Sequence, residues 1–337
     1  MIVLLLRKLL FPISLLYGLV VYLRNVLYNW GIFRSVPFKI PIICVGNLSV
    51  GGTGKTPMIE LLINELDATF NLAVLSRGYK RKSKGFVLAD KNSTVEDLGD
   101  EPFQVHSKFP QVTVAVDANR RNGISILEGD SALDIVLLDD AFQHRKVKPG
   151  FSILLTSYGN LYVDDQYLPT GNLRDSKMAA KRANLIIVTK CPANLSEKEA
   201  LSIKTRLDPR DGQEVLFAYL KYGERLMGSR TNLKLSNFLG KQVTLVTGIA
   251  APEPLVSYLN EKEVAFEHIA FPDHHFFTAT EIDHLKGKAH ILTTEKDFMR
   301  LRTKLDNIVY IPIKHAFLFK GTETLQERLN IFMKRYP

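Results

Sequence analysis

One segment of the chain has the residue types that could bind the phosphates of a nucleotide. GNLSVGGTGKTP (46–57) lies between an apolar run that predicts a buried strand, 40–47, and a stretch that predicts a helix, 57–66. A glycine loop in that position lets backbone N–H groups and the helix N-terminus surround phosphate oxygens. The predicted nucleotide-binding residues follow one another along the loop: Ser49, Val50, Gly51, Gly52, Thr53, Gly54, Lys55 and Thr56.

Two of these residues have side chains suited to phosphoryl transfer. We expect Lys55 to reach the β- and γ-phosphates and the Thr56 hydroxyl to bind Mg²⁺. The strict pattern G-x-x-x-x-G-K-[ST] has glycine where this chain has Ser49, and Gly51 and Gly52 supply the backbone freedom at shifted positions. The alternative is a glycine-rich turn with an incidental Gly-Lys-Thr, which the flanking strand and helix patterns disfavour.

A pair of carboxylates follows another predicted strand. In DIVLLDDAFQH (134–144) four apolar residues lead to Asp139 and Asp140, which would reach the carboxyl edge of a parallel sheet, where ligands of open α/β folds bind. At least one of them should hold Mg²⁺, directly or through water, although a solvated turn is the alternative. The run Thr189-Lys190-Cys191-Pro192 lacks the carboxylate that pairs with guanine in GTPases, so ATP is favoured.

Two short segments offer a group that could take a proton from the phosphate acceptor. LGDEP (98–102) contains Asp100 and Glu101, and FPDHHFF (271–277) contains His274 beside other polar residues. A carboxylate from one domain that meets a histidine from the other across a cleft would form a general-base pair. Spacing alone leaves ordinary loop residues as the alternative.

Several basic segments could contact phosphate or an anionic surface. RRNG (120–123) follows a predicted strand, so that Arg120 could contact phosphate, and SRGYKRKSKG (76–85) carries five basic residues and no acidic one. TTEKDFMR (293–300) also places polar residues after a strand. Each of these segments could instead be solvated surface.

These segments must be positioned by strands and helices, and the two patterns alternate along most of the chain. Apolar runs typical of strands lie at 40–47, 71–79, 86–90, 111–117, 134–140, 151–157 and 184–190. Buried strands that alternate with helices predict an α/β fold with a mostly parallel sheet, here of the P-loop NTPase type.

A second, smaller α/β domain is predicted from a further group of apolar runs, at 243–250, 265–271, 290–297 and 307–313. We divide the chain into an N-terminal helix (1–30), a P-loop kinase domain (31–214), and a connector with the smaller domain (215–337). The tail from 322 to 336 has apolar residues at helical spacing and is expected to pack against the protein.

The N-terminal segment combines apolar and basic residues. Residues 1–59 contain no Asp or Glu but six basic residues: Arg7, Lys8, Arg24, Arg34, Lys39 and Lys55. Fifteen uncharged residues lie between Lys8 and Arg24, enough for a helix of about 22 Å against a hydrocarbon core of about 30 Å. Flanking basic and aromatic residues favour a helix that lies in the membrane surface. A cleaved signal peptide, a single span and a helix buried on the domain are the alternatives.

The composition is that of a globular protein in a reducing compartment. The chain has 337 residues, 46% hydrophobic and 23% charged, which excludes disorder, collagen and a coiled coil. The two cysteines, Cys44 and Cys191, can form neither a disulfide framework nor a zinc site. The net charge of +9 is local, because residues 1–59 contribute +6, the loop 77–84 contributes +5, and the rest sums to −2. That distribution favours anionic lipid and phosphate over nucleic acid.

Nine motifs in register give the chain a resemblance to a known family. They are the apolar basic N-terminus, GNLSVGGTGKTP, SRGYKR, GDEP, DDAFQHR, GNLRDS, VTGIAAPEP, FPDHHFF and TTEKDFMR. The chain resembles the tetraacyldisaccharide 4′-kinases of lipid A biosynthesis. The resemblance implies ATP- and Mg²⁺-dependent phosphorylation of the 4′-hydroxyl of a lipid A disaccharide 1-phosphate to give lipid IVA. It implies that the enzyme acts at the cytoplasmic face of a Gram-negative inner membrane, binds no nucleic acid and has no obligate protein partner.

The resemblance also implies roles for single residues. Asp100 looks like the general base and His274 like its partner. Asp139, Asp140 and Glu101 would surround Mg²⁺, and the substrate would lie near Arg120, Gln143, Arg174 and Asp175.

Two positions depart from the family pattern. Ala141 stands where DDGFQH has glycine, which is tolerable only if the backbone φ is negative there. Asp175 stands where glutamate is more usual, so its side chain is shorter by one methylene.

Two other functions remain as hypotheses. A membrane-attached P-loop ATPase could act as a nucleotide switch, which lipid-independent ATP hydrolysis without a phosphorylated lipid would support. A nucleic-acid-binding ATPase is the weaker one, and strongly salt-dependent duplex binding would support it.

Overall fold

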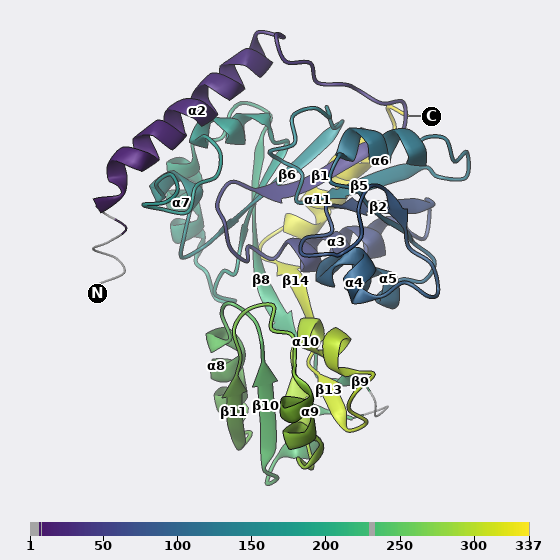
Figure 1. The fold of residues 1–337 in the computed structure, drawn as a ribbon. Coiled ribbons are helices and arrows are strands. Elements are labelled where there is room, and N and C mark those ends of the chain that lie inside the picture. The colour runs from purple at the N-terminus through teal and green to yellow at the C-terminus, as the bar shows by residue number, and fades with distance from the viewer. Residues whose placement is uncertain (1–6, 8, 229–232, 337) are drawn as a thin grey trace.

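The computed structural model describes residues 7, 9–228 and 233–336, which form two sheets with helices packed around them (Figure 1). The large sheet has nine strands in the order β14-β8-β7-β6-β1-β5-β2-β4-β3. Their bounds are β1 (Ile42–Asn47), β2 (Leu72–Ser76), β3 (Val87–Leu88), β4 (Thr113–Val116), β5 (Ile135–Asp139), β6 (Phe151–Ser157), β7 (Leu185–Thr189), β8 (Glu214–Tyr222) and β14 (Ile313–Phe317). Every apolar run predicted as a strand before residue 190 lies in this sheet.

The large sheet is mostly parallel, as its apolar strands predict. β1 pairs in parallel with β5 on one side and with β6 on the other, so that the ends of these three strands lie together. Among the described strands of this sheet, antiparallel pairing is confined to its two edges, where β3 meets β4 and β14 meets β8. All residues of β1 and β5 are buried, because helices cover both faces of the sheet.

Helices form an apolar layer on each face. On one face, α3 (Lys55–Leu66), α5 (Asp100–Lys108) and α11 (Gly321–Met333) share a core with the strands. On the other face, α6 (Arg120–Leu127) and α7 (Glu197–Leu207) do so. The predicted C-terminal helix is therefore confirmed as a packing element. The remaining short helices of this part are α4 (Val95–Leu98), η1 (Tyr162–Asp164) and η2 (Lys177–Arg182).

A second unit carries a five-stranded sheet in the order β11-β10-β12-β13-β9. Its elements are β9 (Met227–Gly228), η3 (Leu235–Phe238), β10 (Val243–Thr247), α8 (Glu253–Glu261), β11 (Phe266–Ala270), α9 (Ala279–Lys286), β12 (Ile291–Thr293), α10 (Glu295–Leu301) and β13 (Ile308–Tyr310). The smaller α/β domain is thus present, and its four longer strands are those that the sequence predicts.

The chain divides between the two sheets differently from the expected boundary at residue 215. Strand β8 extends the large sheet to Tyr222, although the connector was expected to begin at residue 215. After the second unit, β14 pairs antiparallel with β8, and α11 packs beneath them. The second unit is therefore an insertion between two neighbouring strands of the large sheet. Pairing between segments ninety residues apart leaves no local pattern in the sequence.

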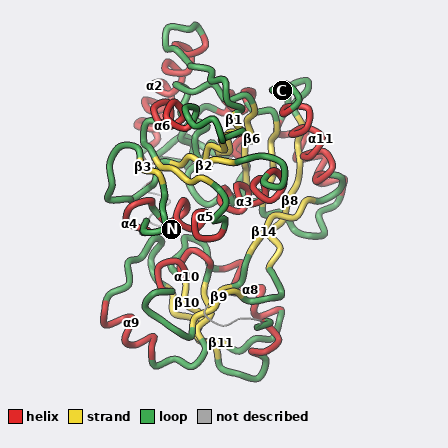
Figure 2. The backbone as a smooth tube through the Cα atoms, turned by 90° about the vertical axis from the view of Figure 1, so that its right-hand side faces the viewer, coloured by secondary structure: helices red, strands yellow, loops and turns green. Residues whose placement is uncertain are grey.

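The two units share an apolar cluster. Leu98 and Phe103 of the large unit pack with Phe298 and Tyr310 of the second unit in one buried cluster. Figures 1 and 2 show α5 and α10 next to each other at this junction. Helices α5 and α10 therefore hold the two units against each other.

The N-terminal helix α2 (Phe11–Asn29) lies on the outside of the large unit (Figure 1). Its buried residues are Ser14, Gly18, Val21 and Asn25, which form one mostly small and polar stripe. Its long apolar side chains are exposed, among them Leu15, Leu16, Leu19 and Leu23. Among the described helices, α2 alone is long and apolar enough to cross a membrane, and 17% of its most apolar window is buried. The segment 1–6 and Lys8, which belong to the expected N-terminal helix, lie outside the described residues.

Polar contacts fix α2 to one loop of the large unit. Ser14 Oγ donates to Thr170 Oγ1 at 2.8 Å, and Asn25 Nδ2 donates to Asp175 Oδ1 at 2.7 Å. A Cβ on Gly18 would lie 2.7 Å from the ring of Tyr167, so glycine permits the close approach. The helix is amphipathic with its polar stripe inward and its apolar face outward, the reverse of a helix on a soluble domain.

Candidate active site

The phosphate loop joins β1 to α3 and has the backbone that its glycines permit. Gly51 and Gly54 have φ of 111° and 83°, and Gly54 caps the helix that starts at Lys55. A Cβ on Gly54 would lie 2.8 Å from His315 Nε2, which donates a hydrogen bond to the Gly54 carbonyl. Glycine at this position is therefore required both by conformation and by space.

The segment 165–174, which also carries Arg174, holds the phosphate loop in place through hydrogen bonds. Ser49 Oγ donates to Asp165 Oδ2 at 3.0 Å, and the backbone N–H of Val50 donates to the Asn172 carbonyl at 2.8 Å. The buried hydroxyl of Thr53 has no partner among the described residues. The predicted ATP-binding residues are therefore one continuous segment, a loop that ends at Gly54 and the first two residues of α3, and the loop is held from outside.

Lys55 faces the carboxylates at the end of β5. Its Nζ lies 3.9 Å from Asp140 Oδ2 and 3.5 Å from Asn47 Oδ1. Arg174 makes a two-pronged ion pair with Asp140 and also donates to Asn47 Oδ1. Burial would raise the pKa of Asp140, but Lys55 and Arg174 hold it below its usual value. Two cations, one carboxylate and the phosphate loop are thus brought together.

Asp139 lies beside this group in a different environment. Its Oδ2 accepts a hydrogen bond from Ser76 Oγ at 3.2 Å, while its buried Oδ1 has no partner among the described residues. Burial and the neighbouring Asp140 raise the pKa of Asp139 to about 6. A buried carboxylate oxygen without a donor is a place where a bound cation would be stabilised.

The turn after β5 explains how Ala141 is accommodated. Positive φ occurs at Asp140 (47°) and not at Ala141, so the methyl group is tolerated, as expected. The chain then passes close to β1, where a Cβ on Gly46 would lie 2.6 Å from Phe142 Cβ. Glycine at position 46 in β1 therefore lets the turn after Asp140 approach the phosphate loop.

These residues fit a magnesium ion that is held together with nucleotide phosphates. Mg²⁺ usually takes one or two carboxylates and completes its octahedron with water and phosphate oxygens. Asp139 and Asp140 provide such oxygens, and the Thr56 hydroxyl lies in the first turn of α3. Within the described ranges, no cluster of three or more acidic, histidine or cysteine side chains forms a ready-made metal site. The donor set thus suits a metal ion that arrives with its nucleotide.

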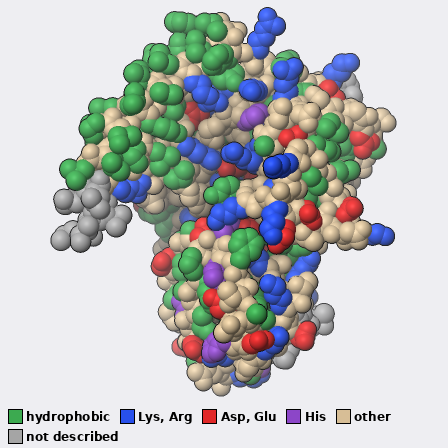
Figure 3. All heavy atoms as spheres, viewed as in Figure 1, with side chains coloured by type: hydrophobic (Ala, Val, Ile, Leu, Met, Phe, Trp, Pro, Cys, Tyr) green, Lys and Arg blue, Asp and Glu red, His purple; other side chains and the backbone are tan. Residues whose placement is uncertain are grey.

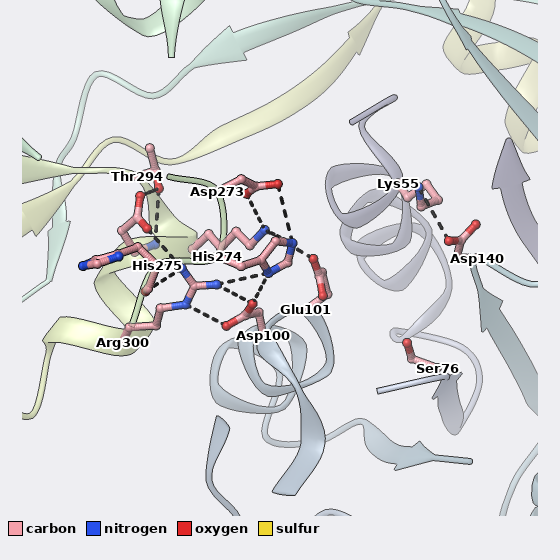
Figure 4. A network of polar contacts seen from close by, with 12 residues as sticks. Lys55, Ser76, Asp100, Glu101, Asp140, Asp273, His274, His275, Thr294 and Arg300 are labelled. Atoms are coloured by element: carbon pink, nitrogen blue, oxygen red, sulfur yellow. Dashed lines mark hydrogen bonds and ion pairs between the residues drawn. The ribbon is translucent and has the colours of Figure 1, made fainter. Parts of the chain in front are cut away.

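A second polar cluster joins the two units (Figure 4). His274 Nδ1 donates to Asp100 Oδ2 at 2.6 Å, across 174 residues of sequence. Arg300 Nε donates to Asp100 Oδ1 at 2.8 Å, and its Nη2 donates to Oδ2. Lys296 Nζ lies 3.0 Å from His274 Nε2, which therefore accepts its hydrogen bond. The carboxylate–histidine pair predicted across the two domains is present.

The cluster sets the protonation of Asp100. Burial would raise the pKa of Asp100, but hydrogen bonds from His274 and Arg300 hold it well below its usual range. The Nε2 of His274, on the far side of the ring from Asp100, faces Lys296 Nζ and Asp273 Oδ2. The cluster is thus a carboxylate with one histidine and one guanidinium as donors.

Helix packing explains why these residues meet. Asp100 is the first residue of α5, and Arg300 lies on α10, which packs against α5. His274 follows β11 at the carboxyl edge of the second sheet and has a φ of 61°. A positive φ is uncommon for histidine, so the surrounding structure must hold the backbone of His274 in this conformation.

The other predicted residues are divided between the two clusters and the docking of α2. Glu101 Oε1 lies 3.6 Å from Lys296 Nζ, and Figure 4 shows Glu101 between the Asp100 cluster and Lys55. Arg120 is buried and donates to the carbonyls of Asp117 and Ala118.

Gln143 and Asp175 serve as internal braces. Gln143 Nε2 donates to the Asn47 carbonyl at 2.6 Å, and the Gln143 carbonyl accepts from Arg24 on α2. Asp175 is fully buried and accepts from Asn25 and Arg182. Asp175 is thus enclosed between α2 and Arg182, whereas Gln143 is half-buried beside Asn47.

Sequence reasoning missed Asn47 and Arg300. Asn47 is the last residue of β1 and contacts both Lys55 and Arg174, although the loop motif predicts no role for its side chain. Arg300 lies four residues after Lys296 on one helix, so both face the same direction. The four-residue spacing of Lys296 and Arg300 in TTEKDFMR was the sequence feature from which a role for Arg300 could have been predicted.

The fold and this site together define a class of protein. A phosphate loop at the edge of a parallel sheet, with a lysine, two carboxylates and an arginine around it, defines a P-loop nucleotide-dependent kinase. The family model for tetraacyldisaccharide-1-P 4′-kinase matches residues 6–333. The chain therefore belongs to the tetraacyldisaccharide 4′-kinase family and is an ATP-dependent kinase of lipid A biosynthesis.

Similar proteins support this membership over the whole chain. A tetraacyldisaccharide 4′-kinase of Flavobacterium johnsoniae is 50% identical over 321 residues, 93% of this chain and 94% of the relative. One of Bacteroides thetaiotaomicron is 45% identical over 315 residues, 88% of this chain and 83% of the relative. The crystal structure of LpxK from Aquifex aeolicus, an "apo" form in complex with ATP, has a TM-score of 0.79 at 28% identity and covers 97% of this chain and 99% of that chain.

Proposed function

We propose that the chain phosphorylates the 4′-hydroxyl of an acylated disaccharide 1-phosphate at the phosphate loop, with Asp100 as the base. The observation that carries this proposal is the hydrogen-bonded cluster of Asp100, His274 and Arg300, which faces the phosphate loop across the junction of the two units. ATP binds at residues 49–56, and the sugar hydroxyl approaches from the side of Asp100.

The donors around Asp100 leave room for one more hydrogen bond. A carboxylate has about four lone-pair positions, and Arg300 and His274 occupy three of them. The remaining position accepts the proton of the attacking hydroxyl. A weak base suffices because the phosphoryl group passes through a loose transition state, in which the nucleophile forms little bond before its proton leaves. His274 is a positioning residue that orients the carboxylate.

Cations at the phosphate loop stabilise the charge on the transferred phosphoryl group. Lys55 and Arg174 are both within reach of Asp140, and the phosphate oxygens of ATP would take over these contacts. Asp139, Asp140 and Thr56 would hold Mg²⁺, with Glu101 near them, and the ion would neutralise the β- and γ-phosphates when bound. Arg120, buried behind Asp139, adds positive potential to this side of the site.

The outward apolar face of α2 suits the surface of a membrane. The helix presents leucines outward and contacts the large unit through polar side chains. The leucines would therefore be buried only where lipid covers them. An acylated substrate lies in the bilayer, whereas ATP is in the cytosol. We infer that the enzyme lies on the cytoplasmic face of the inner membrane with α2 in the lipid surface.

A direct assay tests this function. The full chain is incubated in detergent with ATP, Mg²⁺ and lipid A disaccharide 1-phosphate, and the expected product is a bisphosphorylated lipid. Lys55→Ala should abolish the product, whereas Lys198→Ala, an exposed lysine on α7, should leave the rate unchanged. ATP hydrolysis without a phosphorylated lipid would contradict the kinase mechanism and support a nucleotide switch.

A further inference from the structure

The amino group of Lys296 lies where the two units meet and has no role in the function described above. Lys296 is a half-buried residue of α10 in the second unit. Its Nζ lies 3.0 Å from His274 Nε2, 3.4 Å from Asp273 Oδ1 and 3.6 Å from Glu101 Oε1. Because Glu101 belongs to α5 of the large unit, one ammonium group contacts both units beside the proton acceptor.

The Nδ1 side of the His274 ring is fixed by Asp100. Nδ1 lies 2.6 Å from Asp100 Oδ2, and the ionised carboxylate can only accept, so the proton between these atoms belongs to Nδ1. Arg300 Nη2 donates to the same oxygen and lies 3.2 Å from Nδ1. The ring of Tyr79 packs edge-on against the imidazole, with 5.7 Å between the ring centres. The orientation of the ring is therefore set on this side.

The Nε2 side of the ring has two neighbours that favour opposite states. The ammonium group of Lys296 can only donate, so it favours an Nε2 without a proton. Asp273 Oδ2 lies 3.7 Å from Nε2 and can only accept when ionised, so it favours a proton on Nε2. Lys296 is the nearer of the two, and its ion pair with Asp273 weakens the attraction of that carboxylate for the ring.

The state of Nε2 affects the strength of the base. A histidine with protons on both nitrogens is a cation, and Asp100 would then be held by two cations, His274 and Arg300. A carboxylate between two cations accepts a proton more weakly than one beside a neutral histidine. A bare Nε2 therefore favours the proton transfer to Asp100.

We propose that Lys296 is a positioning residue for phosphoryl transfer, because it keeps Nε2 of His274 free of a proton while Nδ1 donates to Asp100. The proposal rests on the proposed function and adds a residue that acts through His274. Asp273 is the group whose effect on the ring Lys296 opposes. Removal of Asp273 should therefore compensate for removal of Lys296.

Four variants test this compensation. Lys296→Met removes the donor and keeps the apolar stem, and Lys296→Arg keeps the charge. Lys296→Met with Asp273→Asn removes both competing groups and leaves the net charge unchanged. Lys286→Met with Asp283→Asn is the matched control, since these residues form an exposed ion pair on α9 of the same unit. The kinetics are measured on the full chain in detergent with ATP, Mg²⁺ and lipid A disaccharide 1-phosphate.

We expect Lys296→Met to lower kcat about tenfold or more, with the KM for ATP within about twofold of the unmodified enzyme. Lys296→Arg and the double variant at Lys296 and Asp273 should each retain at least about one third of the kcat, because Nε2 stays bare in both. The control pair should leave kcat unchanged. A double variant no faster than Lys296→Met overturns the proposal, since loss of Asp273 cannot replace a lysine that binds phosphate or only supports the fold.

Magnetic resonance of isotope-labelled histidine tests the proton position directly. The ring nitrogens of His274 are assigned by the loss of their signals in His274→Ala. At neutral pH we expect a bare Nε2 in the unmodified protein and in the double variant, and a protonated Nε2 in Lys296→Met. A protonated Nε2 in the unmodified protein overturns the proposal, and this measurement needs no Lys296 variant to fold.

The outcomes separate this proposal from the proposed function. Undiminished kcat in His274→Ala contradicts the base pair of the proposed function, and the role of Lys296 falls with it. A slow His274→Ala enzyme together with undiminished kcat in Lys296→Met overturns the role of Lys296 alone.

Discussion

Asp100 receives three N–H donors in a buried position, and this environment keeps it ionised at neutral pH. A carboxylate of this kind is always ready to accept a proton but binds it weakly. Such a base suits phosphoryl transfer, in which the attacking hydroxyl loses its proton late. Two predictions at the scale of single residues follow from this geometry.

Removal of either partner of the pair should affect turnover and not ATP binding. Asp100→Asn and His274→Ala are each expected to lower kcat at least about tenfold, because the base or its orientation is lost. Both residues lie outside the phosphate loop, so the Kd for ATP should change little. Steady-state kinetics and calorimetric titration with ATP measure the two effects, and undiminished turnover in both variants would remove the pair from the mechanism.

The guanidinium of Arg300 should control the pH dependence. In Arg300→Gln the carboxylate of Asp100 loses its cation, so its pKa rises and the protonated, inactive form appears at a higher pH. The acid limb of the kcat profile should therefore move to higher pH in the variant. Arg302→Gln, an exposed arginine on the same segment, is the control. Coincident acid limbs would show that Asp100 is not the titrating base.

Helices α3, α5 and α10 are joined by one buried polar group. Lys108 on α5 lies 2.7 Å from Glu60 on α3 and 2.9 Å from Glu295 on α10. Burial and the neighbouring Glu295 raise the pKa of Glu60 to about 7. Because α3 starts at the phosphate loop and α10 carries Arg300, this group links the two halves of the site.

Replacement of Lys108 tests that link at the scale of elements. Lys108→Met leaves two buried carboxylates without a cation and should lower the free energy of unfolding by roughly 3 kcal/mol. Denaturant unfolding measures the loss. The double variant with Glu60→Gln should recover part of it because one uncompensated charge is gone, and additive effects of the two changes would contradict the coupling.

Elements with local patterns could be predicted from the sequence, and elements that depend on distant partners could not. The strands around the phosphate loop are continuous apolar runs, and each one was expected. Strand β8 was assigned to the connector that was expected to begin at residue 215, because its partner β14 lies far along the chain. Arg300 was missed for the same reason, since only the packing of α10 on α5 brings it to Asp100. Asp175 was expected near the substrate, but its burial under α2 depends on a contact across 150 residues.

At the scale of the whole molecule, the apolar face of α2 lies on the outside of the large unit, beside a cavity that basic residues line (Figure 3). The leucines of α2 are exposed, and the basic residues of its C-terminal end lie next to them. Apolar burial would supply the affinity for a bilayer, and the basic residues would favour anionic lipid. A prediction about membrane binding belongs at this scale.

Polar substitutions on α2 should release the enzyme from lipid. Leu16→Gln, Leu19→Gln and Leu23→Gln together should weaken vesicle binding more than about hundredfold, since each buried leucine contributes roughly 1.5–3 kcal/mol. Cosedimentation with anionic vesicles measures the change. Leu201→Gln, an equally exposed leucine on α7, serves as the control. Retained binding of the triple variant would place the membrane contact elsewhere.

The insertion of the second unit between β8 and β14 has a consequence for synthesis of the protein. A chain that leaves the ribosome from its N-terminus makes α2 before eight strands of the large sheet, then the whole second unit, and only afterwards β14. Until β14 arrives, β8 is an open edge of a sheet, which invites pairing with other chains. Early capture of α2 by the membrane would keep nascent chains apart during that interval.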